Sequence, residues 1–276
     1  MVLGMHRSGT SALTRAVNLL GAGLGDADDL YLADDNPGGH WESRALIECN
    51  ERILMAFGGT WWKPPRFSEN WECSRTAETL LENMRTTFDS VYGSAGEPWL
   101  WKDPRLCLTL PLWRRVLDHP YVLLVLREPS AVARSLHARD GLRRSYAFAL
   151  WERYLRSALT AADGLPTVIV RYEDVLADPT AAVAEVRSKL DEIGLTLPGD
   201  PATAATHISS PRPSAASAGH AGSRPQQELL DAIAQMPRAA SAFRPPAIRP
   251  ERWLSRRWRF NRIDARRSGI LQLTRP

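Results

Sequence analysis

Two segments of the chain are apolar almost without interruption, YVLLVLR at residues 121–127 and PTVIVRY at residues 166–172. Runs of this length and composition are typical of strands that are buried on both faces of a parallel sheet. The shorter segments PWLWK at 98–102 and MVL at 1–3 predict two further strands. Three residues are few for a first strand, which leaves open whether the native chain begins further upstream.

Elsewhere the apolar positions recur every three or four residues, which predicts amphipathic helices. The first of these, at residues 11–21, places Leu13, Val17 and Leu20 on one face. We expect further helices at residues 43–57, 74–93, 109–119, 129–139, 143–164 and 179–194. Strands that alternate with helices indicate an α/β fold, and we predict a P-loop-like three-layer fold with a central parallel sheet flanked by helices.

The composition divides the chain into three parts. Residues 1–199 hold the predicted strands and most of the predicted helices, and form the expected P-loop-like core. Residues 200–224 are rich in Ala, Ser and Pro, as in a linker or loop, and residues 225–276 contain one more helical pattern and an Arg- and Trp-rich basic tail. No apolar run reaches the ~18 residues of a bilayer span and no signal peptide is evident, so we expect a cytoplasmic protein.

The net charge of +4 is unevenly distributed along the chain. Residues 244–276 hold ten Arg against Glu251 and Asp264, a net charge of +8, so the rest of the chain carries −4. A chain that is basic only at one end is not a uniformly basic nucleic-acid binder, and we expect no nucleic-acid partner.

The three cysteines, Cys49, Cys73 and Cys107, are scattered and lack the spacing of metal ligands. We interpret them as small core residues of a protein in a reducing compartment. No His, Cys and Asp residues are grouped with metal-ligand spacing, and we expect no metal.

The stretch GMHRSGTS at residues 4–11 lies between the first predicted strand and the first helix. Backbone N–H groups at such a turn, with the N-terminus of the helix, form a site for an anion. The glycines permit a tight backbone path, and the side chains of Arg7, Ser8, Thr10 and Ser11 add donors. P-loops that hydrolyse ATP or GTP place a lysine where Thr10 stands, so an ATPase or GTPase is disfavoured. The alternative is an ordinary glycine-containing turn.

Together with three later segments, this loop resembles the sulfotransferases that use 3′-phosphoadenosine 5′-phosphosulfate (PAPS). GMHRSGTS resembles their 5′-phosphosulfate loop in its bacterial-type variant, and LREPSAVARSL at 126–136 resembles their 3′-phosphate motif. WKDPR at 101–105 resembles the segment with a lysine near the sulfuryl group, and RYEDVLADP at 171–179 the stretch with a tyrosine near the adenine. The motifs occur in family order over about residues 1–195.

The resemblance implies PAPS as the sulfuryl donor and a transfer that needs no metal. The donor-binding residues that it implies are Arg7, Ser8, Gly9, Thr10, Ser11, Arg127, Ser135 and Tyr172. A pairing of Arg127 with Glu128 is the alternative for that arginine. Some branches stack an aromatic residue on adenine at the position of Ala12, so adenine stacking must come from elsewhere or be absent here.

The resemblance also implies which residues carry out the transfer. Lys102 stabilises the charge on the leaving oxygen, the alternative being a surface ion pair with Asp103. The cytosolic branch has a histidine base at the position of Pro104, so we expect the base among acidic or imidazole groups after the first helix. Our choice is Glu42, with His40 second and Asp35 third. Glu42 could instead cap the helix that starts near Ser43.

Trp41, Trp61 and Trp62 are expected to flank the acceptor site, because aromatic faces suit sugar rings and flat apolar molecules. Covering the core is their alternative role, and Arg105 is a weaker candidate for contact with donor or acceptor. We therefore expect sulfuryl transfer to a hydroxyl of a carbohydrate, a glycolipid or a small natural product. A P-loop kinase of a small molecule and a non-catalytic nucleotide-binding scaffold are the alternatives.

Three interpretations of the basic tail stay open. It is a solvated terminus, a segment that closes over the nucleotide as in some members of the resembled family, or a peripheral contact with an anionic membrane surface. The sequence gives no oligomeric state.

Overall fold

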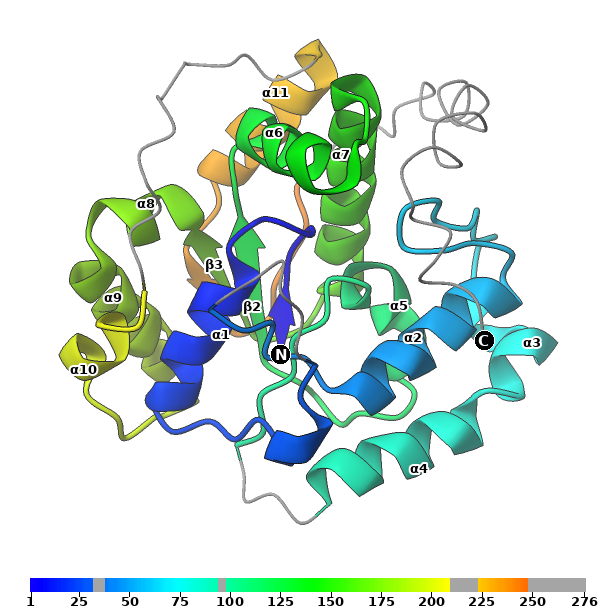
Figure 1. Ribbon diagram of the computed structural model, residues 1–276, viewed down its shortest axis with the longest axis horizontal. Helices are drawn as coiled ribbons and strands as arrows, with labels where there is room; N and C mark the ends of the chain where they lie inside the picture. The colour runs from blue at the N-terminus through cyan, green and yellow to red at the C-terminus, as the bar shows by residue number, and fades with distance from the viewer. Residues whose placement is uncertain (32–37, 94–97, 209–222, 248–276) are drawn as a thin grey trace.

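The computed structural model describes residues 1–31, 38–93, 98–208 and 223–247. Within these residues a four-stranded sheet has the order β1 (Val2–Leu3), β2 (Val122–Leu126), β3 (Thr167–Arg171) and β4 (Ala239–Ala240). The first three strands are parallel, with Leu124 opposite both Leu3 and Ile169, and β4 is antiparallel to β3. The predicted α/β fold with a central, mostly parallel sheet is therefore confirmed (Figure 1).

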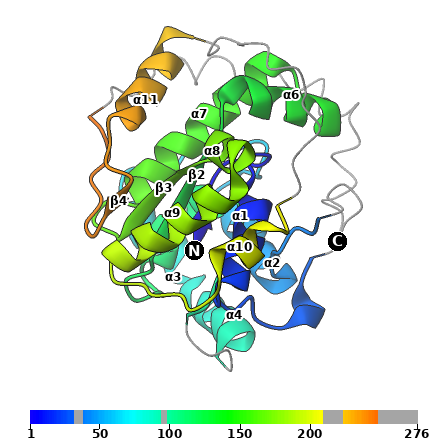
Figure 2. The ribbon, with the colours of Figure 1, turned by 90° about the vertical axis from the view of Figure 1, so that its left-hand side faces the viewer.

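Alternate residues of the strands enter two separate cores, one on each face of the sheet. Leu123 and Val125 belong to the core beneath α1 (Thr10–Leu19), α9 (Pro179–Glu192) and α10 (Pro201–Ala205), which lie in front of the sheet in Figure 2. Leu124 and Leu126 belong to the other core. Strands buried on both faces explain why their sequences are apolar without alternation.

The remaining helices pack around the second core, except for the short helix directly after β3, whose Tyr172 and Val175 join the first core. They are α2 (Arg44–Ala56), α3 (Arg75–Glu78), α4 (Leu81–Tyr92), α5 (Leu106–Trp113), α6 (Pro129–Asp140), α7 (Arg144–Ala161), α8 (Tyr172–Ala177) and α11 (Arg224–Ala234), with short 3₁₀ turns at Ala27–Asp29 and Trp71–Cys73. Two of them begin as their sequences predict. Pro129 and Pro179 occupy the first turns of α6 and α9, behind the capping carboxylates of Glu128 and Asp178.

The strand expected at residues 98–102 does not form a ladder. Val2 N–H donates to the carbonyl of Trp101 at 2.8 Å, while Leu100 N–H donates to the carbonyl of Gly23 at 2.6 Å. Successive residues thus bond to two different segments, which leaves isolated bridges rather than a strand. The segment is nevertheless fixed against β1, and this contact positions Lys102.

Two helices also differ from expectation. The helix expected at 74–93 is interrupted at residues 79 and 80, where the Thr79 hydroxyl bonds the carbonyl of Thr76 and competes with the helical pattern. The helix expected at 109–119 lies earlier, over α5. The short helix α8 directly after β3 was not expected from sequence.

The C-terminal part contributes to the packed structure. Helix α10 lies inside the Ala- and Pro-rich stretch that begins at residue 200, and its Ala204 and Ala205 are buried against α1 and α9. The helix expected beyond this stretch is α11, whose Leu229 and Ile233 join the core. Residues 248–276, with most of the basic tail, lie outside the described residues.

Cys49 and Cys107 are buried, but Cys73 is exposed in a 3₁₀ turn, so the interpretation of all three cysteines as core residues is wrong for Cys73. Across the part of the chain that the structure describes, no helix combines the length and the apolar character of a bilayer span.

Candidate active site

The loop at residues 4–9 lies at the carboxyl end of β1, where it leads into α1. Gly9 adopts a left-handed backbone conformation, with φ of 87°, and no side chain caps the helix. A Cβ atom on Gly9 would lie 2.1 Å from the ring of Tyr172, so only glycine fits between the loop and this ring. The first N–H groups of α1 have no partner within the helix, which leaves them available to an anion.

Two arginines connect the loop to neighbouring strands and helices. The Arg127 guanidinium, after β2, donates to the carbonyl oxygen of Arg7 at 2.7 Å and lies over the Tyr172 ring at 5.0 Å. Nε of Arg7 donates to Oγ of Ser135 on α6 at 2.8 Å. The structure thus brings together Arg7, Gly9, Arg127, Ser135 and Tyr172 from four separate segments.

The expected alternative for Arg127 does not occur. Glu128 instead accepts hydrogen bonds from Ser130 and from the N–H of Ala131, at the start of α6. Among the described residues Arg127 has no carboxylate partner, so its charge remains available to a ligand. Burial raises the pKa of the Tyr172 hydroxyl, against the opposing effect of Arg127. Tyr172 therefore stays uncharged beneath the arginine.

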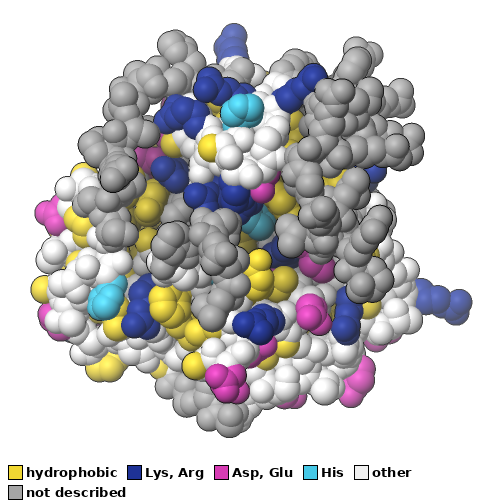
Figure 3. All heavy atoms as spheres, in the orientation of Figure 1, with side chains coloured by type: hydrophobic (Ala, Val, Ile, Leu, Met, Phe, Trp, Pro, Cys, Tyr) yellow, Lys and Arg dark blue, Asp and Glu magenta, His cyan; other side chains and the backbone are white. Residues whose placement is uncertain are grey.

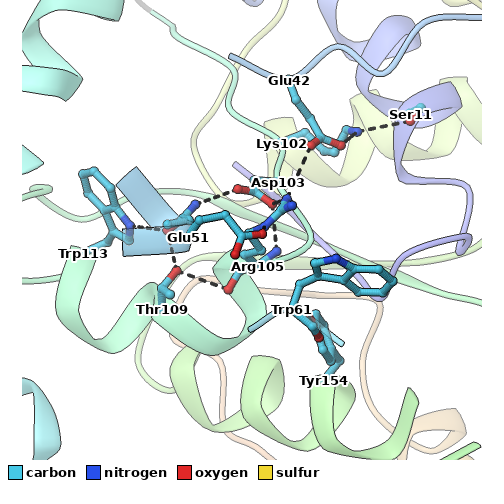
Figure 4. Close-up of polar contacts among 11 residues, drawn as sticks. Ser11, Glu42, Glu51, Trp61, Lys102, Asp103, Arg105, Thr109, Trp113 and Tyr154 are labelled. Carbon is cyan, nitrogen blue, oxygen red and sulfur yellow. Dashed lines mark hydrogen bonds and ion pairs between the residues drawn. The ribbon is translucent and has the colours of Figure 1, made fainter. Parts of the chain in front are cut away.

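Lys102 joins the loop to the segment before α2 (Figure 4). Its side chain is 1% exposed, and its Nζ lies 3.1 Å from Oγ of Ser11 and forms an ion pair with the Glu42 carboxylate. Both expected alternatives are wrong. Lys102 forms no surface pair with Asp103, and α2 is capped by Ser43 itself, whose hydroxyl accepts from the N–H of Leu46.

Arg105 forms the centre of a group of buried charges beside this pair. Its Nε lies 2.6 Å from Glu51, its Nη1 lies 3.0 Å from Asp103, and the same Nη1 is 3.9 Å from Glu42. Burial acts to lower the pKa of Arg105, but Asp103, Glu51 and Glu42 together raise it above its ordinary value. The arginine is therefore a fixed cation that neutralises and orients the carboxylates around it.

Asn50, on α2, links this group of charges to α5 through hydrogen bonds. Its amide donates to Asp103 at 2.8 Å, and its oxygen accepts from Thr109 at 2.7 Å and from the Trp113 indole at 2.8 Å. Sequence analysis missed Asn50 and Glu51. The signal was present, because Asn50 interrupts the apolar face of α2 between Leu46 and Ile53 and is buried there.

His6 is a second residue that sequence analysis missed, although it lies inside the loop motif. Its ring packs against Trp61, with ring centroids 4.5 Å apart, and its buried Nε2 has no hydrogen-bond partner in the described part of the chain. Burial lowers the pKa of His6 well below its ordinary value, and the nearby cations Arg105, Arg139 and Lys102 lower it further. His6 is therefore neutral.

The aromatic residues expected at the acceptor mouth occupy two places. Arg15 lies 4.6 Å from the centre of the Trp41 ring, and His40 packs against Tyr31 with ring centroids 5.1 Å apart. Trp61 lies between His6 and Arg139. Asp35, the third candidate base, lies outside the described residues.

The stretch with Trp61 and Trp62 is fastened to α7. The hydroxyl of Tyr154 donates to the carbonyl of Trp61 at 2.7 Å, and that of Tyr146 donates to the carbonyl of Trp62 at 2.6 Å. Both tryptophans pack against the core, and Trp61 also contacts His6 of the loop, while a role at the acceptor site stays a prediction.

Lys and Arg side chains gather on the face of the molecule that carries the site (Figure 3). They surround the position of α6 and continue toward the middle of this face. Among the described residues, no three His, Cys, Asp or Glu side chains are grouped so as to hold a metal ion. The site thus offers cations and hydrogen-bond donors to an anionic ligand, next to a carboxylate.

The family model described as "Sulfotransferase family" matches residues 1–195. This range includes the loop, Glu42, Lys102, Arg127, Ser135 and Tyr172. The match covers well over half of the chain, and the protein belongs to the sulfotransferase family. Sulfuryl transfer is accordingly its general activity. No curated protein matches the chain.

Proposed function

We propose that this protein transfers the sulfuryl group of PAPS to a hydroxyl group of a carbohydrate, a glycolipid or a small natural product. The observation that carries the proposal is the meeting of Lys102 with Ser11 and Glu42, because it joins an anion-binding helix N-terminus, a cation and a carboxylate at one point. A phosphosulfate on the loop would lie beside Lys102, and an acceptor hydroxyl would lie beside Glu42.

The donor's phosphates find suitable partners among the loop and the two arginines. The 5′-phosphosulfate is proposed to bind the N–H groups and hydroxyls at Ser8, Gly9, Thr10 and Ser11. Arg127 and Ser135, held next to each other by Arg7, are proposed to bind the 3′-phosphate. Tyr172, under Gly9 and Arg127, is proposed to lie near the adenine.

The proposed reaction is an in-line displacement at sulfur. The acceptor oxygen forms a bond to sulfur while the bond from sulfur to the bridging oxygen breaks, and that electron pair stays on the 5′-phosphate of the leaving adenosine 3′,5′-bisphosphate (PAP). Lys102 stabilises the charge on this oxygen, and Glu42 receives the hydroxyl proton, with His40 as the second candidate. Positioning and electrostatics supply most of the catalysis, as in phosphoryl transfer.

The acceptor is proposed to approach past Trp61, because its indole lies against His6 at the edge of the charged group. Flat aromatic surfaces of this kind suit a sugar ring or a phenol. Cytoplasmic location, and contact of the basic tail with an anionic membrane surface, remain proposals that would suit a lipid-linked acceptor.

A small-molecule kinase is the second candidate and is less well supported. A kinase would need a lysine at Thr10, or an equivalent cation, to bind the β- and γ-phosphates. The free charge of Arg127 beside Ser135 instead suits a phosphate on the ribose side of the nucleotide. A scaffold without activity is less well supported because Lys102 and Glu42 are both present and in contact.

Calorimetric titration with PAP, with and without Mg²⁺ and in parallel with ATP, tests the proposal. We expect Mg²⁺-independent binding of PAP that Arg127→Ala weakens about tenfold or more, since a charge-assisted hydrogen bond contributes ~1.5–3 kcal/mol. Arg187→Ala is the matched control, because Arg187 is also half-buried and bonds a backbone carbonyl, that of Gly199, but lies on α9. Binding of Mg-ATP alone would reject the proposal in favour of a kinase.

A screen of hydroxyl acceptors with PAPS follows, with Glu42→Gln as the control for chemistry. We expect this variant to bind PAP and to lose transfer by at least about 100-fold, the usual contribution of a general base. Transfer at the wild-type rate in Glu42→Gln would remove Glu42 from the mechanism and favour His40.

A further inference from the structure

Two neighbouring residues, Trp41 and Glu42, are linked to α1 at positions one helical turn apart. Glu42 is linked to Ser11 through the ammonium group of Lys102 (Figure 4), and the guanidinium carbon of Arg15 lies 4.6 Å from the centre of the Trp41 ring. Ser11 and Arg15 are four residues apart on α1, so their side chains lie on the same face of this helix. The residue before the proposed base is therefore attached to the same helix face as the base itself.

The backbone of Trp41 has a conformation that a large side chain rarely adopts. Its φ of 58° lies in the left-handed region, where a bulky residue is strained. Such a residue persists only where its surroundings hold it in place. Arg15 stacks on its ring, and Gly39 leaves room for the ring, because a Cβ atom on Gly39 would lie 2.9 Å from the indole. Contacts of the Trp41 ring thus maintain the strained backbone.

The backbone after Trp41 is held by hydrogen bonds to an earlier segment of the chain. The carbonyl oxygen of Glu42 accepts from the N–H of Tyr31 at 2.7 Å, and the hydroxyl of Ser43 donates to the carboxylate of Asp29. Trp41 supplies an anchor on the N-terminal side of Glu42, through its ring. Glu42 is therefore held from both directions along the chain.

We propose that Trp41 is a positioning residue for sulfuryl transfer, and that its ring on Arg15 fixes the backbone from which Glu42 extends. This inference rests on the proposed function, in which Glu42 receives the hydroxyl proton. A base must lie within hydrogen-bond reach of that proton, and a displacement of about 1 Å is enough to lower a rate ~100-fold. Trp41 acts through Glu42 in this role and needs no contact with the reacting atoms.

A double-mutant cycle in urea unfolding tests this coupling without any ligand. Glu42→Gln removes the carboxylate partner of the buried Lys102, so we expect it to lower the urea midpoint of the wild type. In the Trp41→Ala background the carboxylate is no longer held against Lys102, so we expect Glu42→Gln to lower the midpoint only about half as much or less. Equal shifts in the two backgrounds, or no shift in either, would overturn the inference.

Trp41→Gly is a second variant, which removes the ring and also relieves the strain at φ of 58°. Glycine adopts the left-handed conformation freely, so we expect Trp41→Gly to unfold about 2–4 °C above Trp41→Ala. We nevertheless expect both variants to lose transfer equally, because both lack the ring that anchors Glu42. Recovery of transfer along with stability in Trp41→Gly would show that Trp41 serves folding alone, and would overturn the inference.

Transfer from PAPS to an acceptor found in the screen measures the effect on the chemistry. We expect both Trp41 variants to lower kcat at least about tenfold and to change the affinity for PAP less than about twofold. In Glu42→Gln, which lacks the base, Trp41→Ala is expected to cause no further loss. A further loss there, or a higher acceptor KM at unchanged kcat, would mean that Trp41 does not act through Glu42.

Asn70 is the matched control for the strained backbone. It is also a non-glycine residue with positive φ, 53°, but it is exposed and precedes the turn at Trp71–Cys73, which packs against α3 and α5. We expect Asn70→Gly to be more stable than Asn70→Ala, as at Trp41, and both to keep kcat within about twofold of the wild type. A loss of transfer in the Asn70 variants that equals the loss in the Trp41 variants would overturn the inference.

The outcomes separate this inference from the function on which it rests. If wild-type protein binds no PAP and transfers no sulfuryl group, the proposed function fails and the inference fails with it. If wild-type protein transfers the sulfuryl group and depends on Glu42, but both Trp41 variants keep the wild-type kcat, the function stands and the positioning role of Trp41 is overturned.

Discussion

The guanidinium of Arg127 donates a hydrogen bond to the backbone carbonyl of Arg7, 2.7 Å away, although the two residues are 120 positions apart in the sequence. The contact connects the end of β2 to the loop after β1, and it places at the edge of this loop a cation that has no carboxylate partner among the described residues. A hydrogen bond to a carbonyl fixes the direction of the guanidinium, and the Tyr172 ring supports one of its faces. The Arg127 guanidinium is therefore held in a fixed orientation and also carries a positive charge.

Arg127→Lys tests whether orientation matters. Lysine keeps the positive charge but loses the planar fork that can bond a carbonyl and a phosphate at the same time. We expect the affinity for PAP to fall about tenfold, measured by calorimetry, with Arg187→Lys unchanged within about twofold. Wild-type affinity in Arg127→Lys would mean that charge alone is sufficient.

Gly9→Ala is expected to damage both the loop and its ligand binding. Alanine is strained at φ of 87°, and its Cβ would lie 2.1 Å from the Tyr172 ring. Gly164→Ala is the control, because Gly164 has φ of 78° and no atom within 4 Å of the added Cβ.

In thermal unfolding we expect Gly164→Ala to lose ~1–2 kcal/mol and Gly9→Ala ~1–3 kcal/mol more, with PAP binding lost only in Gly9→Ala. Equal losses of stability in the two variants would show that the ring moves aside at no cost.

Asn50→Ala is expected to destabilise the fold by ~2–4 kcal/mol, since it removes a partner from the buried Asp103 and leaves the Trp113 indole N–H without its acceptor. Urea unfolding measures the change. Asn83→Ala, at an exposed position of α4, should remain within ~0.5 kcal/mol of the wild type. A small effect of Asn50→Ala would indicate that water replaces the amide.

Because the pKa of the buried His6 is lowered, we expect the free energy of unfolding to fall in mild acid. Its folded pKa lies well below the ordinary value of 6.5, so below pH 6.5 the unfolded chain binds a proton that the folded chain excludes. The free energy of unfolding should therefore fall as the pH drops below 6.5, by up to ~1.4 kcal/mol per pH unit from this residue.

Urea unfolding of wild type and His6→Phe at pH 7.5 and 5.5 isolates the contribution, because phenylalanine keeps a ring against Trp61. We expect the variant to lose less stability between the two pH values than the wild type. His207→Phe, at an exposed histidine, should behave as the wild type does. Parallel losses in all three proteins would contradict a buried neutral His6.

The parts of the fold that were predictable are those in which local sequence and tertiary position agree. The apolar runs of β2 and β3, and the Glu-Pro and Asp-Pro starts of α6 and α9, carry their structure in neighbouring residues. The segment 98–102 was mispredicted because its hydrogen bonds alternate between Val2 and Gly23, two partners that its own sequence does not specify. The two residues of β4 are too few to show any pattern.

The candidate site follows the same division. The motifs predicted Arg7, Arg127 and Lys102 as site residues. Only the structure shows which groups each of them contacts. The pairing of Lys102 with Glu42 spans 60 positions and depends on how α2 lies against the sheet, so sequence alone could not distinguish it from a pair with Asp103. The lone Nε2 of His6 is likewise visible only once Trp61 covers its ring.

The hydroxyls of Tyr146 and Tyr154 on α7 donate hydrogen bonds to the backbone carbonyl oxygens of Trp62 and Trp61. Every amino acid has a carbonyl oxygen, so these anchors do not depend on which side chains stand at the two positions. These two hydrogen bonds therefore fix the backbone at residues 61 and 62 whatever side chains the two positions carry. Randomising residue 62 alone, with Trp61 kept against His6 of the donor-binding loop, would give a library that tests acceptor preference without changing this contact.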